Sequence, residues 1–163
     1  SVSPEEVTYI MNKALSAQQN AVKNFGGCTD KFIGDAMMAI FGAPLDLEDH
    51  EDKAIECAKQ IAINMEELNV EFAAKGLPPI KIGIGINSGE AIIGNMGSEQ
   101  RFDYTAIGDA VNIAARLESG TKAAGVDVLI GSNTQKGSSI TLHPLPPVEA
   151  KGKAQKLEVY TIN

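Results

Sequence analysis

The chain has 163 residues and a formal net charge of −7, so it has the size of one domain with enough residues to bury a sizeable core. The acidity argues against nonspecific binding to nucleic acid or to an anionic membrane, and no apolar run reaches the length of a membrane span. No signal peptide is evident, and Cys28 and Cys57 have no CxxC or His partner. We therefore expect reduced, buried or half-buried thiols in a cytoplasmic protein, which could belong to a larger sensor or membrane-tethered protein.

Capping and periodicity signals predict an α+β fold. Ser3, Pro4 and Glu6 form a capping box with Pro in the first turn, so a helix begins there and continues until Gly26-Gly27. The other expected elements are, in chain order, a hairpin over 30–41, a helix over about 48–75, strands over 80–86 and 91–96 joined by a turn at 87–90, a strand ending at 107, a helix closed at 120–125, a strand over 126–130, a loop over 138–147 and a strand over 157–162. This order predicts one domain, 1–163, with a mostly antiparallel sheet covered by helices on one face.

The hairpin over 30–41 carries a candidate ligand for a metal ion. Gly34-Asp35 lies between two apolar runs, which is typical of a tight turn between strands. We expect these runs to be buried, and a carboxylate beside buried strands needs a cationic partner. A divalent metal ion bound to phosphates would be one such partner for Asp35, and Lys31 is a nearby cation that could serve a base or a phosphate.

The segment 104–116 carries a second candidate group. A strand breaks at Gly108-Asp109 and enters a helix in which Asn112 and Arg116 are one turn apart and share a face. The guanidinium is suited to phosphate oxygens, and the amide offers a neutral hydrogen-bond donor beside it. Two interpretations stay open for this pair alone: a phosphate and sugar site, or ordinary polar residues on a solvated helix face.

Three segments together resemble the catalytic domain of the class III adenylyl and guanylyl cyclases. They are KFIGDAMMAIFGAP (31–44), GIGINSGEAIIGNMG (83–97) and YTAIGDAVNIAARLE (104–118), in family order across nearly the whole chain. The resemblance implies a ferredoxin-like βαββαβ core with extra elements. It also implies a head-to-tail homodimer with sites shared between the two copies, and cyclisation of a nucleoside triphosphate assisted by two divalent metal ions, Mg2+ or Mn2+.

The resemblance also implies roles for single residues. Asp35 corresponds to one of two metal-binding aspartates, and Asn112 and Arg116 correspond to the pair that orients the ribose and stabilises charge on the α-phosphate. Phosphate contacts are implied for Lys151, with Lys153 as its rival, and for Arg101.

The residues at the two base-reading positions favour ATP. Lys31 can donate to adenine N1, and the Thr105 hydroxyl can accept from the exocyclic amine, whereas guanine presents the opposite pattern. A guanylyl cyclase resembling this family would carry Glu at 31 and usually Cys at 105. Thr at 105 is similar to the class IIIb subset, for which the resemblance implies bicarbonate as a regulator.

One family feature does not occur in this chain. The second metal-binding Asp belongs to a strand that should precede the helix starting after Ser3, and we expect the parent protein to carry this strand upstream. The alternative to an adenylyl cyclase is a catalytically inactive, cyclase-like module that binds nucleotide or regulates by dimerising. Lys31, Asp35, Asn112 and Arg116 are all present, which favours the enzyme. A cyclic-dinucleotide synthase would need a GG[DE]EF-like hairpin, which Gly26-Gly27-Cys28-Thr29 does not supply.

Overall fold

The computed structural model describes residues 2–33, 36–96, 103–149 and 156–162; for 33, 92–96 and 103–107 it describes the backbone. The elements in chain order are α1 (Pro4–Asn24), β1 (Cys28–Ile33), β2 (Ala36–Ile40), α2 (His50–Ala74), β3 (Ile84–Ile86), β4 (Ile92–Met96), β5 (Asp103–Ile107), α3 (Asp109–Ala124), β6 (Val128–Gly131), α4 (Ser132–Gly137), β7 (His143–Glu149) and β8 (Lys156–Thr161). The α+β class predicted from the sequence is confirmed.

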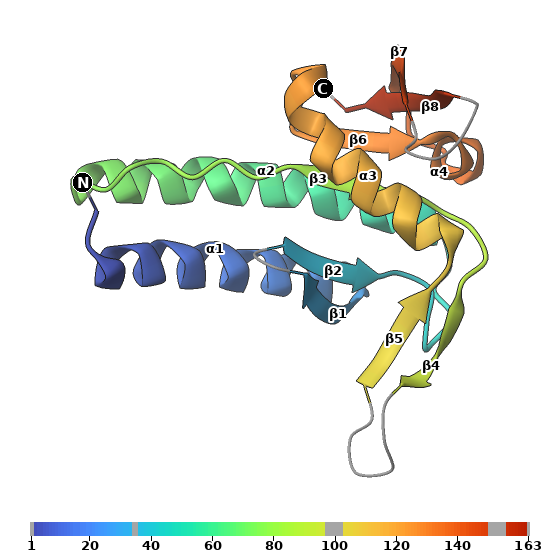
Figure 1. Cartoon of the computed structure of the whole chain (residues 1–163), viewed down its shortest axis with the longest axis horizontal. Helices are drawn as coiled ribbons and strands as arrows, with labels where there is room; N and C mark the ends of the chain where they lie inside the picture. Colours follow the sequence, from blue (N-terminus) through green and yellow to red (C-terminus); the bar gives the residue numbers. More distant parts are fainter. Residues whose placement is uncertain (1, 34–35, 97–102, 150–155, 163) are drawn as a thin grey trace.

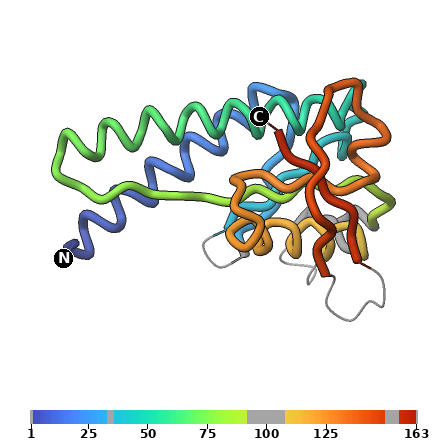
Figure 2. The backbone as a smooth tube through the Cα atoms, turned by 90° about the horizontal axis from the view of Figure 1, so that it is seen from above, coloured from blue at the N-terminus to red at the C-terminus, as the bar shows by residue number. Residues whose placement is uncertain are grey.

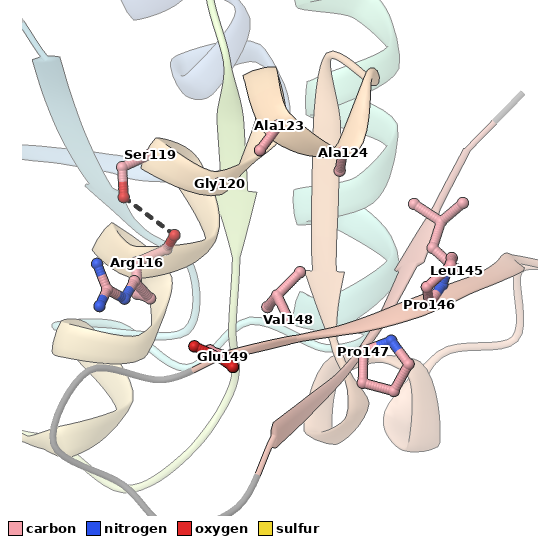
Figure 3. A pocket seen from close by; sticks show the side chains of 10 residues that line it. All are labelled: Arg116, Ser119, Gly120, Ala123, Ala124, Leu145, Pro146, Pro147, Val148 and Glu149. Carbon is pink, nitrogen blue, oxygen red and sulfur yellow. Dashed lines mark hydrogen bonds between the residues drawn. The ribbon is translucent and has the colours of Figure 1, made fainter.

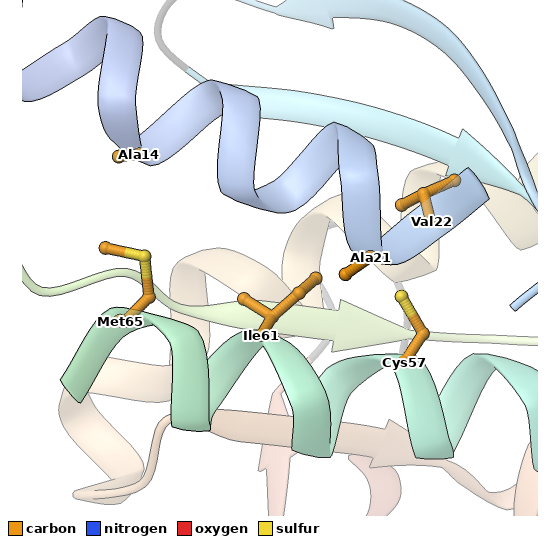
Figure 4. Packing of buried hydrophobic residues seen from close by; sticks show 6 residues of the cluster. All are labelled: Ala14, Ala21, Val22, Cys57, Ile61 and Met65. Carbon is orange, nitrogen blue, oxygen red and sulfur yellow. The ribbon is translucent and has the colours of Figure 1, made fainter. Parts of the chain in front are cut away.

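Two long antiparallel helices, α1 and α2, lie side by side (Figures 1 and 2). The capping box of α1 forms as predicted, because Ser3 Oγ accepts from the Glu6 amide at 3.1 Å and Glu6 Oε1 accepts from the Ser3 amide at 3.0 Å. Small and apolar side chains fill the space between the helices (Figure 4): Ala14, Ala21 and Val22 from α1, and Cys57, Ile61 and Met65 from α2. Among the described residues, every helix is too short or too polar to cross a lipid bilayer.

A four-stranded sheet with the order β3-β6-β8-β7 forms the second part of the core. Every residue of β6 is buried, and its side chains alternate between two helices. Val128 and Ile130 pack with residues of α2, whereas Leu129 packs with Leu117 of α3. Helices therefore cover both faces of this sheet, and the predicted single covered face is wrong.

Two strand predictions differ from the structure. The segment 138–147, expected to be a loop, includes the first five residues of β7, from 143 to 147. This strand lies at the edge of the sheet, with one side unpaired by the described strands. Three prolines are tolerated there because an edge strand need not donate hydrogen bonds on both sides. The strands over 80–86 and 91–96 do not form the expected hairpin. The first is reduced to β3, which pairs with β6 in parallel, and β4 pairs with β5.

The hairpin of β1 and β2 forms its own two-stranded sheet. Met37 and Ala39 pack against the core between α1 and α2, but all of β2 is only half-buried and Phe32 remains 50% exposed. The predicted burial of these apolar runs is therefore incomplete in one copy of the chain. The thiols are free, as expected, but only Cys57 is buried; Cys28, at the start of β1, is exposed.

The first turn of α2 holds the segment that leads into β7. Asp52 accepts three hydrogen bonds: from Ser138 Oγ at 2.6 Å, from the Ser139 amide at 2.9 Å and from Ser139 Oγ at 2.5 Å. These bonds, the Ser138 hydroxyl foremost, lower the pKa of the Asp52 carboxyl. One carboxylate thus fixes residues 138–140 to the helix.

Candidate functional site

The helix α3 presents Asn112 and Arg116 on one face, as the sequence predicts. It starts directly after Gly108, whose φ of 151° suits glycine, and ends at Gly125 in the left-handed conformation. Leu117 and Thr121 are buried against the sheet, whereas Asn112 is exposed and Arg116 is half-buried. Both polar side chains are therefore accessible to a ligand.

Glycines in and beside β3 allow α3 to lie directly on this strand. A side chain at Gly85 would clash with the backbone carbonyl of Ala114 and the amide of Glu118, and one at Gly83 would clash with the Thr121 hydroxyl. Backbone atoms cannot move aside as a flexible side chain can. The missing Cβ atoms thus set the distance between the helix that carries Arg116 and the sheet.

A hollow of about 460 Å³ lies between α3 and β7 (Figure 3). Apart from Arg116, Ser119 and Glu149, its lining residues are apolar or glycine: Gly120, Ala123 and Ala124 from α3, and Leu145, Pro146, Pro147 and Val148 from β7. Among the described residues, no acidic side chain forms an ion pair with Arg116. The guanidinium can therefore offer its charge to an anion at this hollow. Glu149, the last residue of β7, is two residues before the predicted phosphate contact Lys151.

The strands that carry the two predicted base readers contact each other. Lys31 is exposed on β1, where Asp30 and Lys31 lie opposite Met38 in a β-bulge, since Thr29 pairs with Ala39 and Phe32 with Met37. Thr105 lies on β5, paired with Gly94, and β5 contacts both β1 and α3. The fold therefore places the strand of Thr105 next to both the strand of Lys31 and the helix of Asn112 and Arg116.

The turn after β3 contains polar contacts that we did not predict. The Asn87 amide donates to the Ala110 carbonyl at 3.0 Å, and the Ser88 hydroxyl hydrogen-bonds to that of Thr134 at 2.7 Å. Asn133 also donates to the Ser88 carbonyl, at 3.1 Å. The Asn-Ser pair in a glycine-containing turn was the available signal, because such side chains commonly bond nearby backbone groups.

Four predicted positions lie outside the described residues: the metal ligand Asp35 and the phosphate contacts Arg101, Lys151 and Lys153. Within the described part of the chain, no group of three or more His, Cys, Asp or Glu side chains could hold a metal ion.

Comparison with known proteins identifies the family of the chain. The family model for the adenylate and guanylate cyclase catalytic domain matches residues 1–163. Adenylate cyclase 1 of Rhizobium meliloti (strain 1021) is 33% identical over 162 residues, which are 98% of this chain but only 24% of that protein. Among solved structures, the adenylyl cyclase CyaB from P. aeruginosa has a TM-score of 0.89 at 30% identity, and the guanylyl cyclase Cya2 has a TM-score of 0.88 at 31% identity. Each comparison covers 98% of this chain, with 83% of CyaB and 81% of Cya2.

Proposed function

Because the chain belongs to the adenylate and guanylate cyclase catalytic domain family, we propose that it is an adenylyl cyclase catalytic domain that converts ATP to 3′,5′-cyclic AMP and pyrophosphate. In this reaction the ribose 3′ oxygen loses its proton and bonds to the α-phosphorus. The bond from that phosphorus to the bridging oxygen breaks, and the electron pair leaves with pyrophosphate. The supporting observation is that β5 and α3 are separated only by Gly108, so the strand of Thr105 and the helix of Asn112 and Arg116 form one continuous unit.

Asn112 and Arg116 act on the reacting atoms in this proposal. Both are accessible on one face of α3, and Arg116 reaches the hollow beside β7. Asn112 orients the ribose for in-line attack, and Arg116 stabilises the negative charge that develops on the oxygens of the α-phosphate. A fixed cation is effective here because it is already oriented before charge develops.

Lys31 and Thr105 select the base. The contact between β1 and β5 supports a common pocket for the two side chains, with Lys31 donating to adenine N1 and Thr105 accepting from the exocyclic amine. The likeness to an adenylyl and to a guanylyl cyclase structure is nearly equal, so overall similarity does not select between ATP and GTP. The residue types at positions 31 and 105 carry the assignment to ATP.

The triphosphate is held by further charges. Asp35 would help to hold the divalent ions, Mg2+ or Mn2+, which neutralise the triphosphate when bound. Lys151, two residues after Glu149 in the sequence, and Arg101 contact phosphate oxygens in this proposal. Two copies of the chain pair head to tail, so that Asp35 of one copy serves the nucleotide held by Lys31 and Arg116 of the other.

An inactive cyclase-like module that binds nucleotide or regulates by dimerising is the second candidate. It is supported by one observation: among the described residues, no group of three or more His, Cys, Asp or Glu side chains could hold a metal ion. In that case the chain would bind ATP without turnover.

The test is product formation by the purified protein with ATP or GTP and with Mg2+ or Mn2+. We expect cyclic AMP from ATP in excess over cyclic GMP from GTP, and a higher rate when bicarbonate is added. Nucleotide binding without either product supports the inactive module, and cyclic GMP as the main product contradicts the roles of Lys31 and Thr105. An unchanged rate with bicarbonate removes only the proposed regulator.

A further inference from the structure

Asn87 occupies a narrow place between the end of β6 and the first turn of α3. Its side-chain nitrogen donates to the Ala110 carbonyl at 3.0 Å. Its side-chain oxygen lies where a Cβ on Gly131 would be only 2.5 Å away, so the last residue of β6 leaves space for this amide by being glycine. Asn87 thus connects the sheet to the helix that carries Asn112.

The start of α3 has no cap of its own. Among the described residues no side chain caps this helix, and its preceding residue is Gly108. Contacts from the turn after β3 hold this first turn from the side, since the Asn87 amide donates to the Ala110 carbonyl and a Cβ on Gly89 would lie 2.9 Å from the Ala110 Cβ. The position of the first turn of α3 therefore depends on residues outside the helix.

The turn that carries Asn87 is itself fixed from the opposite side. Ser88 bonds the Thr134 hydroxyl, which is fully buried in α4, and the Ser88 carbonyl accepts from Asn133. Since α4 follows β6 without a linker, the turn is attached to the sheet at two points. Because α4 holds the turn in place, the Asn87 amide can fix the position of α3.

From these contacts we infer that Asn87 is a positioning residue, which holds the first turn of α3 and through it places Asn112 for the reaction. Asn112 follows Ala110 by two residues, so a shift of the first turn moves the Asn112 side chain with it. The catalytic part of this inference rests on the proposed function. Misplacing a substrate-orienting group by about 1 Å can cost on the order of a hundredfold in rate.

The test compares Asn87→Ala with Ser88→Ala, the neighbouring residue of the same turn. Ser88→Ala removes the bond to the Thr134 hydroxyl, but the Ser88 carbonyl still accepts from Asn133 and keeps the turn attached to α4, and the bond from Asn87 to Ala110 is unaffected. Both variants should lower the thermal midpoint of unfolding. We expect Asn87→Ala to lower kcat roughly tenfold or more with KM for ATP unchanged, by the positioning argument above, and Ser88→Ala to keep kcat per folded molecule. Asn87→Asp, which keeps the shape and loses the donor, should resemble Asn87→Ala.

Two further measurements separate positioning from general destabilisation. In an Asn112→Ala background, Asn87→Ala should cause little additional loss of kcat, because the group that it places is gone. Hydrogen exchange at the amides of Val111 and Asn112 should be faster in Asn87→Ala and unchanged in Ser88→Ala. Equal kcat losses in both variants, or full additivity with Asn112→Ala, would overturn the inference. If the wild type made no cyclic nucleotide, the proposed function would fail, while unchanged exchange in Asn87→Ala would independently refute the hold on α3.

Discussion

Lys31 owes its direction to a local irregularity of the hairpin. A regular strand alternates its side chains between two faces, but Asp30 and Lys31 lie together opposite Met38, and such a bulge bends the strand and re-aims a side chain. In the proposed base-reading role, the residue type at position 31 would set the hydrogen-bonding pattern offered to a base, and the bulge would set where it is offered.

Exchanging the base-reading residues should change the preferred nucleotide. In the double variant Lys31→Glu/Thr105→Cys, a carboxylate replaces the donor to adenine N1 and can accept from guanine N1 and N2. We expect the ratio of kcat/KM for ATP to that for GTP to fall at least tenfold, since a mismatched polar group in a site costs about 1–3 kcal/mol. Steady-state kinetics with both nucleotides measures this ratio. Lys59→Glu, an exposed charge reversal on α2, is the control, and an unchanged ratio in the double variant would refute the assignment.

Asp52 should make the stability of the fold sensitive to acid. Its hydrogen bonds to Ser138 and Ser139 lower the pKa of the folded-state carboxyl below the ordinary value of 3.8. Their stabilisation is therefore complete above that value and is lost as the pH falls through the lowered pKa. We expect Asp52→Asn to lower the free energy of unfolding at neutral pH by roughly 1 kcal/mol, a value reduced by solvent screening. The variant should also lose less stability than the wild type as the pH falls into the acidic range.

Urea unfolding at a series of pH values from 2 to 7 (roughly the range over which carboxyl groups and histidines titrate) tests this expectation. Glu56→Gln removes an exposed carboxylate from the same helix and should lose stability at acidic pH as the wild type does. If both variants lost the same stability at every pH, the hydrogen bonds of Asp52 would not be its source.

Among the contacts between elements, the close packing of α3 against β3 determines where the candidate site lies. Gly83 and Gly85 leave no side chain between the strand and the helix, so the backbone of Ala114 and Glu118 rests close to the strand. A helix held in this way has one well-defined distance from the sheet.

Gly85→Ala should displace α3. The added methyl group meets backbone atoms of Ala114 and Glu118, and overpacking of this kind costs about 1–3 kcal/mol. We expect a lower midpoint in urea and a loss of kcat in the fraction that folds. Gly120→Ala is the stability control, because its Cβ would have ordinary contact with Leu129 at 3.5 Å and the helix gains about 1 kcal/mol from replacing Gly by Ala. Equal stability of the two variants would contradict the close packing of α3 against Gly85.

Local signals predicted the helices well and the strand pairing poorly. The capping box of α1 and the glycine end of α3 depend on neighbouring residues, so the sequence reveals them. The partner of β3 depends on contacts with a strand more than forty residues away, and the alternating isoleucines of 80–86 could not identify it. The prolines of β7 are compatible with a strand only at a sheet edge, a tertiary property that no local pattern contains.

At the scale of the whole molecule, the half-buried hairpin of β1 and β2 is consistent with the proposed pairing of two copies. Phe32 is half exposed, and apolar surface of this kind is favourable to cover with another chain. Asn112 and Arg116 could be predicted as neighbours because one helix turn separates them. The contact between the strands of Lys31 and Thr105 could not, because β1 ends at Ile33 and β5 begins only at Asp103.

Shared sites predict complementation between two inactive variants. Asp35→Ala lacks the metal ligand and Arg116→Ala lacks the phosphate cation, so each variant alone should be nearly inactive. A mixed dimer would contain one site with both groups intact. We expect a co-purified mixture to regain roughly a quarter of the wild-type rate, since half of random pairs are mixed and each has one working site. A mixture as inactive as its components, with mixed dimers verified by differential tags, would argue against shared sites.

The two thiols differ in exposure, so their labelling rates can report on the separation of α1 and α2. Burial between α1 and α2 raises the pKa of the Cys57 thiol to about 11, which suppresses the nucleophilic thiolate, whereas Cys28 is exposed on β1. An alkylating dye should therefore tag Cys28 quickly and Cys57 only when the paired helices part. The rate of the second labelling event would give the frequency of that separation in the native protein without any substitution.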